Sequence, residues 1–109
     1  MEPLLILTNL PDAASAEKLA QALVASRAAA CVNVLAACRS IYRWEGAIET
    51  ATEVPLLIKT TRAAYPQVEE IVRIQHPYAV PELIAMPITH GMPAYLAWLA
   101  TETEKHHEE

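Results

Sequence analysis

The residues from His76 to Glu82 place an imidazole, a phenol and a carboxylate between and around two prolines. A histidine and a glutamate this close together can form an acid–base pair, and an imidazole can also ligate a metal ion. Pro77 lacks a backbone donor and disfavours the α region at His76, so a helix that approaches this segment should end near Gln75. We refer to residues 76–82 as the proline corner.

A structural role for the proline corner competes with a chemical one. In that alternative, His76 caps the last carbonyls of the preceding helix. Glu82 then forms an ion pair with Lys59 or Arg73. We favour this alternative, in which the corner fixes the turn from a helix into the strand that follows.

Other candidate metal ligands are scattered along the chain. Neither C-x-x-C nor H-x-x-x-H spacing occurs, and Cys31 and Cys38 would face opposite sides of one regular strand because they are seven residues apart. We therefore expect both cysteines to be small buried hydrophobes without a disulfide. Metal binding by His106 and His107 should be incidental. The soft or borderline donors are His76, His90, His106, His107, Cys31, Cys38, Met86 and Met92.

Enzymatic chemistry has weak support in this sequence. No serine lies in a nucleophile elbow, and neither cysteine is marked as an activated thiol. With only two glycines, the chain has no Gly-rich phosphate loop. We therefore expect a protein that is not an enzyme and has no organic cofactor.

The composition indicates one small domain that exposes part of its apolar surface. Of the 109 residues 53% are hydrophobic, so we expect part of this surplus to lie at a subunit interface. A net charge of −5 and scattered Lys and Arg residues argue against a nucleic-acid partner. No apolar run is long enough to span a membrane and the N-terminus lacks the features of a signal peptide, so we expect a cytoplasmic protein.

The pattern of apolar residues predicts alternating strands and helices. Asp12 is the expected cap of the first helix, and Pro93 opens the last. Pro55 should lie at the start of a strand or at an edge, because it cannot donate to a ladder. Residues 35–39 form a bulge, a bend or a break within a long strand. We expect strands at residues 4–7, 31–34, 41–45, 54–60 and 83–89, and helices at about 14–28, from 63 or 64 to 75, and from 93 onward.

This order of elements predicts an α+β fold of the ferredoxin-like plan, a split β-α-β-β-α-β unit followed by a C-terminal helix. In that plan two helices pack on one face of a four-stranded antiparallel sheet, and the other face is bare. A second copy of the chain is the expected cover for the bare face. Residues 1–109 form one domain, with a polar tail from about residue 103 that should fray.

Two aromatic residues mark another candidate surface. Tyr42 and Trp44 alternate with Ile41, Arg43 and Glu45, so both aromatic side chains point to one face of a strand. Exposed aromatic side chains beside charged residues suit a subunit interface or a shelf for a ligand. Ordinary packing on a sheet face is the alternative.

Five short motifs occur in order along the chain: Ala30-Cys31-Val32-Asn33, Ser40-Ile41-Tyr42-Arg43-Trp44-Glu45-Gly46, Lys59-Thr60-Thr61, His76-Pro77-Tyr78-x-x-Pro81-Glu82 and Tyr95-Leu96-x-Trp98. Together they resemble the CutA divalent-cation-tolerance family, and the resemblance extends from about Leu5 to Leu99. It implies a ferredoxin-like homotrimer. The implied architecture is similar to that of the PII signalling proteins, which bind small ligands in clefts between subunits.

The resemblance also implies a link to metal ions. In some family members copper binding is attributed to a cysteine at the end of the first strand and to two consecutive histidines before Pro-Tyr. Here Thr8 stands at the first place and Gln75-His76 at the second. His76 is therefore the remaining candidate ligand for Cu(II) or another divalent cation.

Two hypotheses for the function follow from the resemblance. In the first, a non-enzymatic homotrimer takes part in the response to divalent metal ions and binds Cu(II). In the second, a PII-like signalling module binds a small anionic ligand in a cleft between subunits. The residues expected to line that cleft are Tyr42, Arg43, Trp44, Lys59, His76, Tyr78 and Glu82, and those expected at the trimer interface are Tyr42, Trp44 and Trp98.

Overall fold

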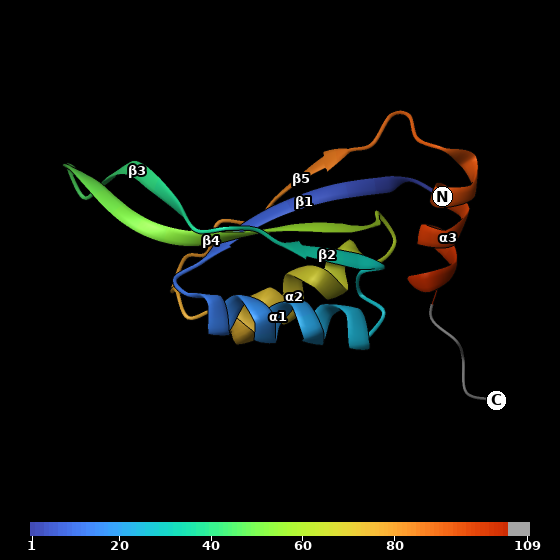
Figure 1. Cartoon of the computed structure of the whole chain (residues 1–109), viewed down its shortest axis with the longest axis horizontal. Helices are drawn as coiled ribbons and strands as arrows, with labels where there is room; N and C mark the ends of the chain where they lie inside the picture. The colour runs from blue at the N-terminus through green and yellow to red at the C-terminus, as the bar shows by residue number, and fades with distance from the viewer. Residues whose placement is uncertain (105–109) are drawn as a thin grey trace.

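A computed structural model describes residues 1–104 of the chain (Figure 1). Residues 105–109 lie outside the described part. The predictions made for His106, for His107 and for the end of the polar tail fall on these residues. The elements in order are β1 (Pro3–Leu10), α1 (Ala13–Ala25), β2 (Cys31–Val34), β3 (Cys38–Trp44), β4 (Ala47–Thr61), α2 (Tyr65–Gln75), β5 (Ile84–Pro87) and α3 (Pro93–Glu102).

The five strands found among residues 1–104 pair antiparallel. The strand order is β2-β4-β1-β5, and β3 pairs with the part of β4 that extends beyond β2. Helices α1 and α2 lie together on one face of the sheet, and α3 lies at the end of the sheet near the N-terminus (Figure 1). The expected mixed fold, with an antiparallel sheet and three helices, is confirmed.

The core lies between the sheet and the helices α1 and α2. Along β1, Ile6 and Leu10 are fully buried, because residues two apart in a strand point to the same face. Leu19 and Leu23, four residues apart on α1, and Val68 on α2 meet them from the helical layer. These contacts exclude water from one face of the sheet and fix the position of both helices.

The opposite face of the sheet has no helix over it among the described residues (Figure 1). Leu5 pairs with Met86, while Leu7 pairs with Leu57 on one side and Ile84 on the other. Ile84 and Met86 are 49% and 46% exposed. Residues opposite each other in a sheet share a face, so these five side chains form a continuous apolar surface. We refer to it as the open face.

β4 is much longer than the strand expected at residues 54–60, and the prediction that Pro55 lies at a strand start or edge is wrong. Pro55 lies inside β4, and its carbonyl accepts a hydrogen bond from the backbone N–H of Leu35 at 3.0 Å. The nitrogen of Pro55 points to the same side, because the donor and acceptor of one residue in an antiparallel strand face the same neighbour. On that side β2 ends at Val34 and β3 begins at Cys38. The missing donor therefore faces the break between two strands.

The outer part of β4 and all of β3 form a two-stranded hairpin that extends beyond the helices (Figure 1). We refer to residues 38–53 as the arm. Its turn consists of Glu45 and Gly46, with φ of 49° and 83°. Positive φ at both positions is the requirement of a type I′ turn, whose twist matches that of the strands. Ile41 and Ile48 on the arm are 65% and 69% exposed.

Local capping defines the ends of α1. Asp12 caps the helix as expected, because its carboxylate accepts hydrogen bonds from the hydroxyl of Ser15 at 2.6 Å and from its backbone N–H at 2.7 Å. These bonds lower the pKa of Asp12. The helix ends at Ala25 and not at residue 28, because Arg27 turns the chain with a φ of 65°.

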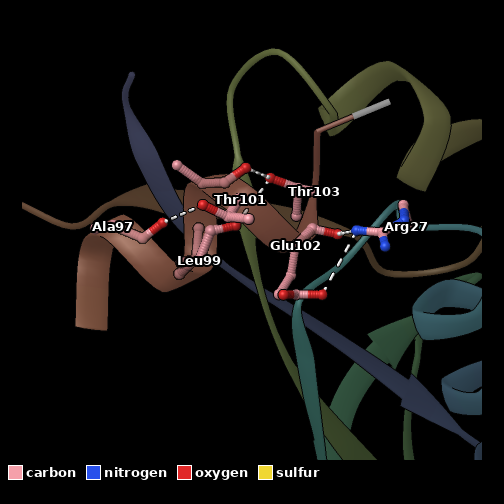
Figure 2. Close-up of polar contacts among 7 residues, drawn as sticks. Arg27, Ala97, Leu99, Thr101, Glu102 and Thr103 are labelled. Atoms are coloured by element: carbon pink, nitrogen blue, oxygen red, sulfur yellow. Dashed lines mark hydrogen bonds and ion pairs between the residues drawn. The ribbon is translucent and has the colours of Figure 1, made fainter. Parts of the chain in front are cut away.

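α3 is held by one buried leucine and by an arginine at its C-terminal end (Figure 2). Leu99 is fully buried, and Arg27 Nη1 donates to the backbone carbonyl of Glu102 at 3.2 Å. A cation at this end of a helix also offsets the partial negative charge of the last carbonyls. Thr103, where a frayed tail was expected to begin, is buried and its hydroxyl donates to the carbonyl of Leu99 at 3.0 Å. The chain therefore stays packed against α3 at Thr103, one residue past the end of the helix.

Candidate functional site

A cleft of about 840 Å³ lies between the arm and the proline corner. The arm contributes Tyr42, Trp44 and Glu53 to its lining, and the corner contributes Tyr78 and Glu82. Three aromatic rings and two carboxylates therefore face one space. None of the residues that line this cleft is a lysine or an arginine.

His76 anchors the proline corner from within. Its Nδ1 accepts a hydrogen bond from the backbone N–H of Tyr78 at 3.1 Å, and its Nε2 lies 2.7 Å from the backbone carbonyl of Asn9. Because Nδ1 accepts, the neutral ring carries its hydrogen on Nε2 and donates it to Asn9. His76 is only 7% exposed, and both of its ring nitrogens are therefore engaged in hydrogen bonds that are shielded from water. Its side chain ties α2 to β1, whereas its backbone N–H donates to Val72 at the end of α2.

Glu82 is held by β1 and not by the expected basic residues. Its side chain accepts from Asn9 Nδ2 at 2.8 Å, and its backbone carbonyl accepts from Thr8 Oγ1 at 2.6 Å. Arg73, one expected partner, pairs with Glu70 on α2. The proline corner is thus fixed to the end of β1 by two hydrogen bonds to Glu82 and by one from His76.

Tyr78 connects the corner to the arm across the cleft. Its hydroxyl donates to Glu53 Oε2 at 3.1 Å. Burial, and then the bond to the Glu53 carboxylate, raise the pKa of Tyr78 above its ordinary value, which already leaves a phenol protonated at neutral pH. Glu53 is only 8% exposed, and no ion pair involves it within residues 1–104.

The structure brings together most of the residues that the sequence placed in a cleft. Tyr42, Trp44, Tyr78 and Glu82 line it, and His76 packs against Tyr78 with ring centroids 4.9 Å apart.

The two cations expected in the cleft do not line it. Arg43 pairs with Ile48, so both lie on the face of the arm opposite Tyr42 and Trp44. Lys59 is six residues beyond Glu53 along β4, which separates them by about 20 Å.

The sequence does not place Glu53 in the cleft, because the strand predicted at residues 54–60 begins after it, whereas β4 begins at Ala47. The signal that would have located it is the Glu45-Gly46 pair. A two-residue turn at these positions sets Trp44 opposite Ala47 and then Cys38 opposite Glu53. That register places the carboxylate on the face of the arm that carries the aromatic residues.

The described residues give little support for a metal centre. Within residues 1–104 no group of three or more His, Cys, Asp or Glu side chains is close enough to hold a metal ion. Both cysteines are free, and Cys38 is exposed, not buried as expected, because the arm has no core of its own. Cys31 is half-buried on β2.

The sequence matches one family over most of its length. A profile of the CutA1 divalent ion tolerance protein matches residues 4–102. The divalent-cation tolerance protein CutA of Thermus thermophilus is 45% identical over 98 residues, which cover 90% of this chain and 95% of that protein. Protein CutA of Mus musculus is 45% identical over 94 residues, which cover 86% of this chain and 53% of the mouse protein.

Solved structures show the same architecture. The divalent cation tolerance protein of T. thermophilus superposes with a TM-score of 0.92 at 43% identity, covering 94% of this chain and 99% of that chain. CutA1 from Oryza sativa gives a TM-score of 0.93 at 34% identity and 97% coverage of both chains.

Fold and sequence together define a small mixed α/β protein of the divalent-cation tolerance class. The chain belongs to the CutA1 divalent ion tolerance family. No helix among the described residues is long and apolar enough to cross a membrane. A relative from Archaeoglobus fulgidus, 33% identical with a TM-score of 0.90 over 94% of this chain and 99% of its own, is called periplasmic. The expected cytoplasmic location stays a prediction.

Proposed function

We propose that the chain is a homotrimeric, non-enzymatic protein of divalent-cation tolerance whose cleft binds a small ligand. The open face is the observation that carries this proposal. It is a continuous apolar surface that no helix among residues 1–104 covers, and contiguous apolar surface of this kind marks sites of interaction. Assembly of identical chains would remove it from water.

The arm supports the same assembly. A two-stranded hairpin without a packed face is marginally stable in water, yet Ile48, on the face of the arm opposite Tyr42 and Trp44, is 69% exposed. Contact with a neighbouring subunit would bury such side chains. Tyr95 and Trp98 on α3, each 42% exposed with ring centroids 5.5 Å apart, offer a second aromatic contact.

The strand order β2-β4-β1-β5, with α1 and α2 on one face, supports a ferredoxin-like plan in which β2 and β3 together replace one long strand. A trimer of such units would resemble the PII signalling proteins. In that arrangement the cleft at the base of the arm would lie beside a neighbouring subunit. Ligand binding in this cleft would then be the signal to which the protein responds.

Copper binding by His76 is the second candidate function, and the described geometry argues against it. Both ring nitrogens already have partners, and the hydroxyl of Thr8 is engaged with Glu82. To bind His76, a copper ion would have to break one of the buried hydrogen bonds of the ring. Within residues 1–104, no cluster of three His, Cys, Asp or Glu side chains would supply the remaining ligands. Calorimetric titration of Cu(II) into a variant with His106→Ala and His107→Ala would test this site. Binding that His76→Ala abolishes would restore copper as the ligand.

The oligomeric state tests the main proposal. Sedimentation equilibrium at micromolar concentration should give a mass of about 36 kDa, three times the 12.0 kDa of one chain. Met86→Lys should raise the dissociation constant by about tenfold or more, because it places a charge in the open face. Ile74→Lys is the matched control, since Ile74 is an exposed apolar residue of α2, outside the open face. A monodisperse monomer of the unsubstituted chain would refute the proposal.

A further inference from the structure

The cleft is negatively charged, whereas an anionic ligand requires a positively charged site. Glu53 and Glu82 line it, and no lysine or arginine does. Arg43 lies on the other face of the arm, and Lys59 lies about 20 Å from Glu53 along β4. An anion in this space would meet two carboxylates without a compensating cation.

The buried carboxylate of Glu53 needs a positively charged group to balance its charge. Its side chain accepts a hydrogen bond from the Tyr78 hydroxyl, while 92% of the residue is withdrawn from water. The phenol of Tyr78 is uncharged near pH 7, so this bond does not balance the charge. Buried carboxylates in proteins are normally paired with a cation, and no ion pair to Glu53 occurs within the described part of the chain.

The aromatic residues decide what kind of cation fits. Tyr42, Trp44 and Tyr78 are 44%, 52% and 37% exposed, so parts of their rings remain open to a ligand. Aromatic faces attract alkylated ammonium groups, which disperse their charge over methyl groups and lose their water readily. A metal ion needs several oxygen, nitrogen or sulfur ligands at short range, and residues 1–104 offer no cluster of three acidic, histidine or cysteine side chains.

We infer that the cleft between the arm and the proline corner takes a small organic cation with an alkylated ammonium group. Tyr42, Trp44 and Tyr78 surround the methyl groups, and Glu53 and Glu82 supply the negative charge. This inference rests on the proposed function of the cleft as a ligand site, and it replaces the anion that the sequence suggested.

Three probes of matched shape separate charge from size. Choline carries the positive charge, 3,3-dimethylbutan-1-ol is its neutral isostere, and 3,3-dimethylbutanoate is a similar anion. Isothermal titration of each into the full chain should show choline binding about tenfold or more tightly than the alcohol, with the carboxylate weakest. Equal affinity for choline and the alcohol, preference for the carboxylate, or no binding of any probe would overturn the inference.

Two substitutions locate the binding. Glu53→Gln preserves the shape of the side chain and an acceptor for Tyr78, yet it should weaken choline binding by about tenfold. Glu69→Gln makes the same change at an exposed residue of α2 that does not line the cleft, and it should leave the affinity within about twofold. Equal loss in both variants would show a general charge effect and overturn the inference.

The oligomeric state, measured for each sample, keeps this inference separate from the proposed function. A monomeric wild type would refute the proposed trimer, whatever binds. An intact trimer in which Glu53→Gln weakens assembly but not choline binding would show that a neighbouring subunit neutralises Glu53. That result would overturn the inference and leave the trimer in place.

Discussion

Replacing Thr8 with valine would test whether the proline corner is fixed by its attachment to β1. Thr8 is fully buried, and its hydroxyl donates to the backbone carbonyl of Glu82 at 2.6 Å. Valine has almost the same shape, so the substitution would preserve packing and leave this partly buried carbonyl without its donor. An unsatisfied group of this kind costs about 1–2 kcal/mol. In a chain of this size, that loss would lower the unfolding temperature by roughly 5–10 °C.

Thr60→Val is the matched control for this experiment. Thr60 is also fully buried, and its hydroxyl donates at 2.6 Å to the carbonyl of Ala28. Both variants should therefore lose similar stability when compared at one protein concentration, which fixes the contribution of assembly. Only Thr8→Val should loosen the proline corner. Amide hydrogen exchange at Tyr78, whose N–H donates to His76, reports this directly.

Two outcomes would refute the reasoning about Thr8. If Thr8→Val is as stable as the wild type, water or a shifted backbone satisfies the Glu82 carbonyl. If Tyr78 exchanges equally fast in both valine variants, His76 and Asn9 hold the corner without help from Thr8. The cleft would then not depend on the attachment of Glu82 to β1.

Three further substitutions test the elements around the cleft. Glu45→Asn should stabilise the turn of the arm by about 0.5–1 kcal/mol, because asparagine adopts positive φ more readily; a lower unfolding temperature would contradict this. Leu99→Ala should cost about 2–5 kcal/mol and speed amide exchange throughout α3, and unchanged exchange would show that Arg27 alone holds the helix. Folding lowers the pKa of Asp12, so its contribution to stability is present above the unfolded pKa and is lost as the pH falls through the folded value. Denaturant unfolding between about pH 2 and 5 should accordingly show a weaker pH dependence for Asp12→Asn than for the wild type.

Local signals were sufficient to locate one boundary of each of the three helices. Asp12 caps α1, α2 ends at Gln75, and Pro93 opens α3, all as the sequence predicts. Each of these boundaries depends on a side chain and on backbone groups within a few residues of it. A cap or a proline restricts the chain in the same way whatever lies elsewhere in the fold.

The strands were less predictable because their extent depends on distant partners. Ala47 to Glu53 belong to β4 since β3 lies beside them, and Pro55 is tolerated inside β4 since β2 ends where its nitrogen points. β5, expected to continue to Thr89, ends at Pro87. Neither the length of a strand nor the tolerance of a proline can be judged from one segment alone.

The charge of the cleft shows how a non-local detail changes a functional conclusion. The sequence placed Tyr42, Trp44, Tyr78 and Glu82 in one cleft, because two motifs set all four on the arm or the corner, and these four residues line the cleft described above. It added Lys59 and Arg43 and omitted Glu53, and these three residues determine the sign of the electrostatic potential. Counting outward from the two-residue turn places Glu53 on the aromatic face and Arg43 on the other. The expected ligand thereby changes from an anion to a cation, and the Glu45-Gly46 turn is the local feature on which that change depends.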